Sequence, residues 1–94
     1  LFFMDKAVVY IHGKGGNVEE AKHYKDLFHD WDVVGLDYTA RFPWEAKEEF
    51  PFLFDQICKG HQSVQIIANS IGAYFAMSAL SDYQIEKAYF FLLW

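Results

Sequence analysis

Residues 64–75 read VQIIANSIGAYF: five mostly aliphatic residues, a short polar turn, and then small and apolar residues at helical spacing. This order predicts a buried strand at residues 64–68 that passes directly into a helix at residues 71–81. A side chain at the apex of such a tight turn is held away from the backbone. Ser70 is therefore either an exposed nucleophile or the N-cap of the helix.

The same alternation of strand and helix runs along the rest of the chain. The remaining strands are expected at residues 7–11, 31–38 and 87–94. The remaining helices are expected at residues 18–28 and 43–60. Asn17 is the predicted N-cap of the first of these, and Pro51 should kink the second or split it in two.

The predicted strands are apolar on both faces, which is typical of a parallel sheet covered by helices on both sides. The sequence thus predicts an α/β fold, built as a three-layer sandwich around a mainly parallel four-stranded sheet. At 94 residues, the length favours a single domain over residues 1–94.

Composition argues against several classes of function. Thirteen acidic and eight basic residues give a net charge of −5, with no basic cluster to neutralise the phosphates of a nucleic acid. Cys58 is the only cysteine, so no internal disulfide forms and a reducing, cytoplasmic setting is expected. No apolar run reaches the ~20 residues of a membrane span, and no ligand spacing suggests a metal. We expect no cofactor, no membrane and no nucleic-acid partner.

Ligands of parallel α/β proteins bind at the carboxyl ends of the strands. Here those ends carry residues 12–16, HGKGG, residues 37–41, and residues 69–72. The GKGGNV segment lacks the third glycine of a dinucleotide fingerprint and does not match a P-loop. Gly13, Gly15 and Asn69 are therefore predicted to line a binding site for a different kind of ligand.

The turn and the glycine-rich loop together suit acyl transfer. This reaction needs a nucleophile and backbone N–H donors aimed at the oxyanion that forms on the attacked carbonyl. Ser70 supplies the nucleophile, the N–H of Ile71 supplies one donor, and the glycine-rich loop supplies another. The N-terminus of the following helix also directs its positive dipole at the developing charge.

The order of HGKGG, a strand ending in GLDY, and ANSIGA resembles the first half of the α/β-hydrolase fold, with its oxyanion loop and nucleophile elbow. Ala68 stands where the family's G-x-S-x-G elbow has its first glycine. The resemblance implies a partial, truncated hydrolase fold and a small acyl ester or amide substrate. It further implies Ser70 as nucleophile, with Ile71 and Lys14 as backbone donors.

In that family the catalytic acid and histidine follow the nucleophile, whereas no histidine follows Ser70 in these 94 residues. The resemblance therefore implies an enzyme that is inactive or very weak alone. His12 is expected to shape the oxyanion loop, and His23 and His29 to be exposed. Asp37 is expected to order its loop, and Arg41 to bind Asp37, a substrate carboxylate or solvent.

A non-catalytic function is the alternative. The tail AYFFLLW forms an apolar strand with no proline or charge, and such a strand invites pairing when it lies at a sheet edge. The sequence thus predicts a homodimer in which residues 88–93 of two chains pair antiparallel. The two sheets would then join into one of eight strands.

Overall fold

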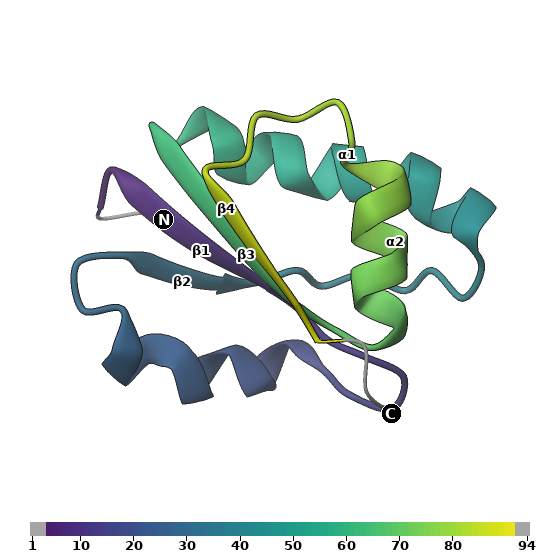
Figure 1. Cartoon of the computed structure of the whole chain (residues 1–94), viewed down its shortest axis with the longest axis horizontal. Helices are drawn as coiled ribbons and strands as arrows, with labels where there is room; N and C mark the ends of the chain where they lie inside the picture. The colour runs from purple at the N-terminus through teal and green to yellow at the C-terminus, as the bar shows by residue number, and fades with distance from the viewer. Residues whose placement is uncertain (1–3, 92–94) are drawn as a thin grey trace.

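The computed structural model describes residues 4–91 and contains four strands and three helices in alternation (Figure 1). In chain order they are β1 (Lys6–Ile11), η1 (Val18–Leu27), β2 (Asp32–Gly35), α1 (Pro43–Lys59), β3 (Ser63–Asn69), α2 (Ile71–Ala79) and β4 (Lys87–Phe91). The predicted alternation is confirmed. The part of the last strand predicted at residues 92–94 lies outside the described residues.

All four strands are parallel and lie in the order β2-β1-β3-β4. In the register of the ladder, Val9 of β1 pairs with Val34 of β2 on one side and with Ile66 of β3 on the other. Ile66 in turn pairs with Ala88 of β4. The α/β fold class with a parallel four-stranded sheet is therefore confirmed.

Two hydrophobic cores lie on opposite faces of this sheet, as expected from strands that are apolar on both faces. Val9 and Ile66 face the core formed with α1 and α2. Phe50 of α1 is fully buried in this core. Val8 and Ile67 face the smaller core beneath η1. In Figure 1 the sheet accordingly lies between α1 above and η1 below.

The path of the chain through the sheet reverses direction at β1. The connection through η1 leads from β1 to β2, and the connection through α1 then passes back over β1 to reach β3. Right-handed crossovers require these two connections to lie on opposite faces. The loops that leave β1 and β3 therefore diverge, and the crevice between two such loops is where α/β sheets bind ligands.

Several element boundaries differ from the sequence prediction. β2 is shorter than expected because the chain turns after Gly35, where Tyr38 N–H donates to the Leu36 carbonyl. α1 is one continuous helix, so of the two predicted effects of Pro51, a kink or a split, the split is wrong. Phe50 and Phe54 on either side of this proline are fully buried, and their packing compensates for the missing backbone hydrogen bond.

The first helix also has an unexpected form. η1 is a 3₁₀ helix of ten residues, much longer than is usual for this conformation. Its predicted cap is confirmed, since the Asn17 side chain accepts a hydrogen bond from Glu19 N–H at 2.9 Å. Ala21 is the buried residue of this helix. No helix within residues 4–91 combines the length and apolar character needed to span a bilayer.

Candidate functional site

Ser70 forms a sharp junction between β3 and α2. Its backbone dihedral angles are φ 53° and ψ −125°, and it is the one non-glycine residue within residues 4–91 with a positive φ. Such a conformation costs about 1–3 kcal/mol and persists only where its surroundings impose it. The tight strand-to-helix turn predicted at Ser70 is confirmed, and the backbone at its apex is strained.

The hydroxyl of Ser70 does not cap the helix that follows it. Ser70 occupies the N-cap position of α2, yet its side chain makes no capping hydrogen bond. Its backbone N–H donates instead to the Phe91 carbonyl of β4, at 2.6 Å. The sequence left two roles open for Ser70. This geometry excludes one of them, which is capping of α2 by the serine side chain.

Small residues make the junction possible. A Cβ atom on Gly72 would overlap the carbonyl oxygen of His12, so only glycine fits where α2 begins against the end of β1. A Cβ atom on Gly13 would lie 3.0 Å from the Ser70 Cβ. Ala68, two residues before Ser70, is fully buried in the core under the turn. The glycine-rich loop therefore packs directly on the serine.

His12 and Tyr38 hold the start of this loop. The Tyr38 hydroxyl donates to the His12 carbonyl at 2.7 Å, and the two rings stack with their centroids 4.3 Å apart. The His12 Nδ1 lies 2.9 Å from the Gly13 carbonyl oxygen. The loop then turns tightly, with Gly16 N–H donating to the Gly13 carbonyl and Gly15 at φ 80°. These contacts give His12 a structural part in shaping the loop.

The glycine-rich loop lines two pockets. One, of about 560 Å³, is lined by Ser70 and Asn69 together with loop residues, Glu20 and Phe91. The other, of about 510 Å³, is lined by Ile71, aromatic side chains and the same loop. Both pockets include Gly13, Lys14 and Gly15. All six residues predicted for the site thus lie together at the carboxyl end of the sheet.

A hydrogen-bond network beside Ser70 was missed by the sequence analysis. The Tyr10 hydroxyl donates to Glu20 at 2.6 Å and accepts from the Asn69 side-chain amide at 2.9 Å. Burial, and then the hydrogen bond to Glu20, raise the pKa of Tyr10. The network links β1, η1 and Asn69, the residue before Ser70. In the sequence, the only sign of this network was Tyr10, a tyrosine one residue from the end of an apolar strand.

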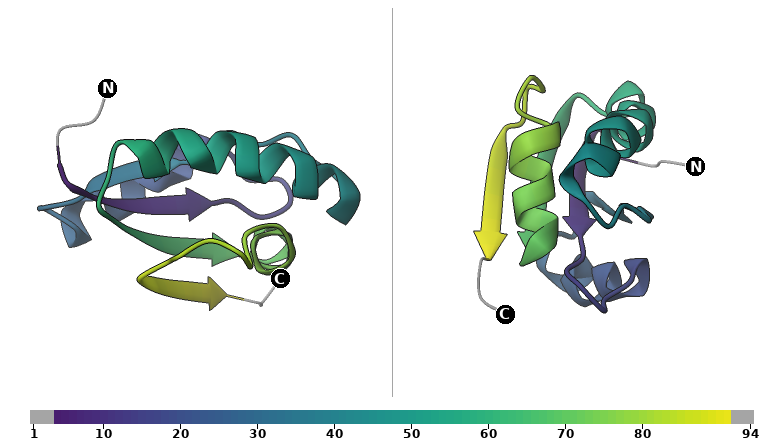
Figure 2. Two further views of the ribbon diagram at one scale, coloured as in Figure 1. Left: turned by 90° about the horizontal axis from the view of Figure 1, so that it is seen from above. Right: turned by 90° about the vertical axis from the view of Figure 1, so that its right-hand side faces the viewer.

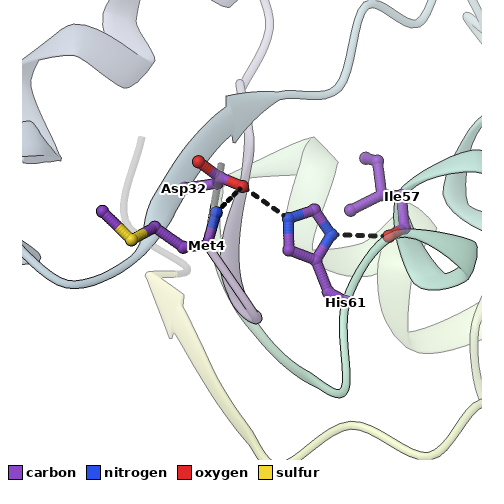
Figure 3. Close-up of polar contacts among 4 residues, drawn as sticks. All are labelled: Met4, Asp32, Ile57 and His61. Carbon is purple, nitrogen blue, oxygen red and sulfur yellow. Dashed lines mark hydrogen bonds and ion pairs between the residues drawn. The ribbon is translucent and has the colours of Figure 1, made fainter. Parts of the chain in front are cut away.

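None of the histidines lines the pocket that contains Ser70. His23 and His29 are exposed, as predicted. His61 lies at the amino end of the sheet, where its Nε2 is 2.8 Å from an Asp32 carboxylate oxygen and its Nδ1 is 2.7 Å from the Ile57 carbonyl (Figure 3). Within residues 4–91 no hydrogen bond joins a histidine ring to the Ser70 hydroxyl.

The same Asp32 carboxylate accepts a hydrogen bond from the Met4 N–H at 3.1 Å (Figure 3). The ring of His61 is fully buried. Both ring nitrogens therefore face oxygen atoms, one of the Asp32 carboxylate and one of the Ile57 carbonyl. This pair ties the starts of β1 and β2 to the end of α1 and has a structural role.

Other chemistry has little basis in the described part of the chain. Residues 4–91 contain no group of three His, Cys, Asp or Glu side chains placed to hold a metal ion. Cys58 is half-buried, and burial raises the pKa of its thiol, which disfavours the reactive thiolate. Asp37 and Arg41 are both exposed, and no ion pair joins them among the described residues.

No protein-family model matches this sequence, and no curated protein matches it. The chain is a small α/β domain. That assignment rests on its parallel four-stranded sheet and on the helices that cover both faces.

Proposed function

We propose that this domain carries the nucleophile and the oxyanion-binding loop of a serine hydrolase of the α/β-hydrolase type. Its substrate is a small acyl ester or amide. The observation that carries the proposal is the backbone of Ser70, which is held at φ 53° while its side chain makes no capping bond. Strain of this kind is characteristic of nucleophile elbows, which expose a hydroxyl above the end of a parallel sheet.

In the proposed reaction the Ser70 Oγ attacks the carbonyl carbon of the substrate. A bond forms between Oγ and carbon, the carbonyl electron pair moves onto oxygen, and the hydroxyl proton passes to a base. The backbone N–H groups of Ile71 and Lys14 stabilise the resulting oxyanion, together with the N-terminus of α2. Collapse of the intermediate expels the alcohol or amine, which takes up the proton, and water then hydrolyses the acyl-serine.

The base is the part that the described residues do not supply. The pocket around Ser70 contains the Glu20 carboxylate, but that group already accepts a hydrogen bond from Tyr10. We therefore propose that a histidine outside this arrangement completes the site. Without it, this chain retains oxyanion binding but little turnover.

Two measurements test the proposal. Phenylboronic acid should form a tetrahedral adduct with Ser70, visible by boron NMR, because its boron bonds to the Ser70 oxygen, the hydroxyl proton passes to the buffer, and the oxyanion donors stabilise the anionic boronate. Hydrolysis of a p-nitrophenyl ester should be slow but should rise with added imidazole, which replaces the missing base. Both signals should disappear in Ser70→Ala. Equal ester rates in the two proteins, together with no adduct, would remove the enzymatic proposal.

Self-association is a second candidate function, favoured by the exposure of β4. This strand lies at the outer edge of the sheet (Figure 2), and Tyr89 and Phe91 are 37% and 52% exposed. We propose that two copies pair antiparallel through residues 88–93 to form a homodimer. Residues 92 and 93 of that segment lie outside the described residues.

The direction of the backbone groups of β4 allows a clean test. The Phe91 carbonyl accepts from Ser70 N–H, so the backbone of Phe91 faces β3. Because this direction alternates along a strand, Ala88 turns its N–H to the open edge. Ala88→Pro should therefore block dimerisation while leaving the pairing with β3 intact. Light scattering should give a dimer mass for the native chain and a monomer mass for Ala88→Pro; a native monomer contradicts the idea.

A further inference from the structure

A second pocket, which shares Gly13, Lys14 and Gly15 with the pocket around Ser70, has an unusual charge. Its wall includes the cationic residues Lys14 and Arg41 but no aspartate or glutamate. Within residues 4–91 neither cation makes an ion pair. The chain as a whole carries a net charge of −5. A positively charged hollow in an acidic protein indicates a ligand that carries negative charge.

The loop that carries Arg41 is fixed in place by α1. The Glu49 carboxylate accepts hydrogen bonds from the backbone N–H groups of Thr39 and Ala40, at 2.9 and 2.7 Å. The Glu45 carboxylate accepts from the backbone N–H of Arg41, also at 2.7 Å. Both acids thus bind backbone N–H groups of this loop. The Arg41 side chain, which lines the pocket, makes no ion pair among the described residues, and its loop is already ordered.

The remainder of the wall is largely apolar and aromatic. The Tyr38 hydroxyl is used by the His12 carbonyl, so the pocket meets mainly its ring. Phe75 is buried and packs edge-on against Tyr38. Phe42 is 47% exposed and stacks on Trp44, which is 66% exposed, with centroids 4.7 Å apart. A volume of about 510 Å³ lies within the range of small-molecule sites.

We propose that this pocket binds the acyl part of the substrate, and that this acyl part has an apolar or aromatic body ending in an anionic group such as a carboxylate. The inference rests on the proposed function, because the two proposed oxyanion donors, Ile71 and Lys14, also line this pocket. The reacting carbonyl lies at the glycine-rich loop. The apolar body packs on Tyr38, Phe42 and Phe75, and the anionic end binds the Arg41 guanidinium.

Charge and shape contribute differently to this recognition. A neutral acyl group would gain only the apolar contacts. A carboxylate would add a charge-assisted hydrogen bond to Arg41. At a partly exposed site, we expect this bond to increase the affinity about tenfold. Because such a pair is screened by ions, the preference should shrink as the salt concentration is raised.

The test uses two matched boronic acids, an arylboronic acid with a distal carboxylate and the same compound with a primary amide in its place. Boron NMR and calorimetry on the native chain should show that both form the Ser70 adduct, and that the carboxylate binds about tenfold more tightly. In Arg41→Gln the two affinities should become equal. Lys47→Gln removes an exposed cation of α1 that lies outside the pocket, and should leave the preference unchanged.

The outcomes separate this inference from the proposed function. If both compounds form the Ser70 adduct with equal affinity, the anionic acyl group is wrong while the hydrolase proposal stands. A boron-free arylalkanoate serves as the complementary probe. If it binds in an Arg41-dependent manner while no boronate adduct forms, the anion site stands and the hydrolase proposal falls. If none of the three compounds binds, both are overturned.

Discussion

Gly72, in the first turn of α2, lies directly against the carbonyl oxygen of His12 at the end of β1. The contact joins the two loops of the candidate site, because His12 begins the glycine-rich loop and Gly72 follows Ser70 by two residues. It leaves no space for a side chain. The site therefore depends on a backbone-to-backbone approach between segments that are distant in the sequence.

Gly72→Ala tests this approach. The new methyl group would meet backbone atoms, which cannot turn aside as a side chain can, so we expect a loss of about 3 kcal/mol in the free energy of unfolding. Urea denaturation measures it. Ser78→Ala, on the exposed face of the same helix, should change stability by less than about 0.5 kcal/mol. Equal stability of the two variants would show that the loops can separate without cost.

Ser70→Gly and Ser70→Ala separate strain from side-chain contacts. Glycine adopts a positive φ without strain. This relief of strain should stabilise the fold by more than the greater conformational entropy of glycine in the unfolded chain destabilises it. We therefore expect Ser70→Gly to be about 1 kcal/mol more stable than Ser70→Ala. Ser70→Ala should lie close to the native protein, because the hydroxyl makes no capping bond. A destabilised glycine variant would mean that the serine conformation carries little strain.

Tyr38 should make stability depend on alkaline pH. Burial, and secondarily the Glu49 charge, raise the pKa of its hydroxyl to about 12 in the folded state, above the ordinary value of about 10. A raised folded-state pKa stabilises the protein below pH ~10, and this contribution is lost as the pH rises toward 12. Urea unfolding across this range should show a steep loss for the native protein.

Tyr38→Phe provides the comparison for that experiment. The variant loses the hydrogen bond to the His12 carbonyl and should be about 1 kcal/mol less stable near neutral pH. The difference between the two proteins should narrow as the pH rises above about 10, since phenylalanine does not ionise. A difference that stays constant across this range would contradict the assignment to Tyr38.

The Asp32–His61 pair should stabilise the opposite end of the sheet. Asp32→Ala leaves the buried His61 ring without a carboxylate at 2.8 Å, and we expect a loss of about 3 kcal/mol. A double-mutant cycle with His61→Ala should give a coupling free energy above about 1 kcal/mol. Ester hydrolysis, if present, should not depend on this pair. Strictly additive losses would show that the two side chains act independently.

Much of the fold could be predicted because its signals are local. The apolar runs, the glycine-rich segment and the Asn17 cap each act on near neighbours, so β1, β3 and the start of η1 were identified from the sequence. The place of Ser70 between strand and helix followed from the same patterns. Its positive φ could also be foreseen, because a direct turn from β3 into α2 forces the residue between them out of the ordinary regions.

The contacts that make a site out of these pieces were decided by the tertiary structure alone. The sheet order places β1 beside β3, which brings Gly13 onto Ser70 and lets Tyr10 join Glu20 to Asn69. The same packing leaves Arg41 without an ion pair among the described residues. Register and crossover hand depend on the sum of many weak contacts across the whole sheet, and no short stretch of sequence contains that sum.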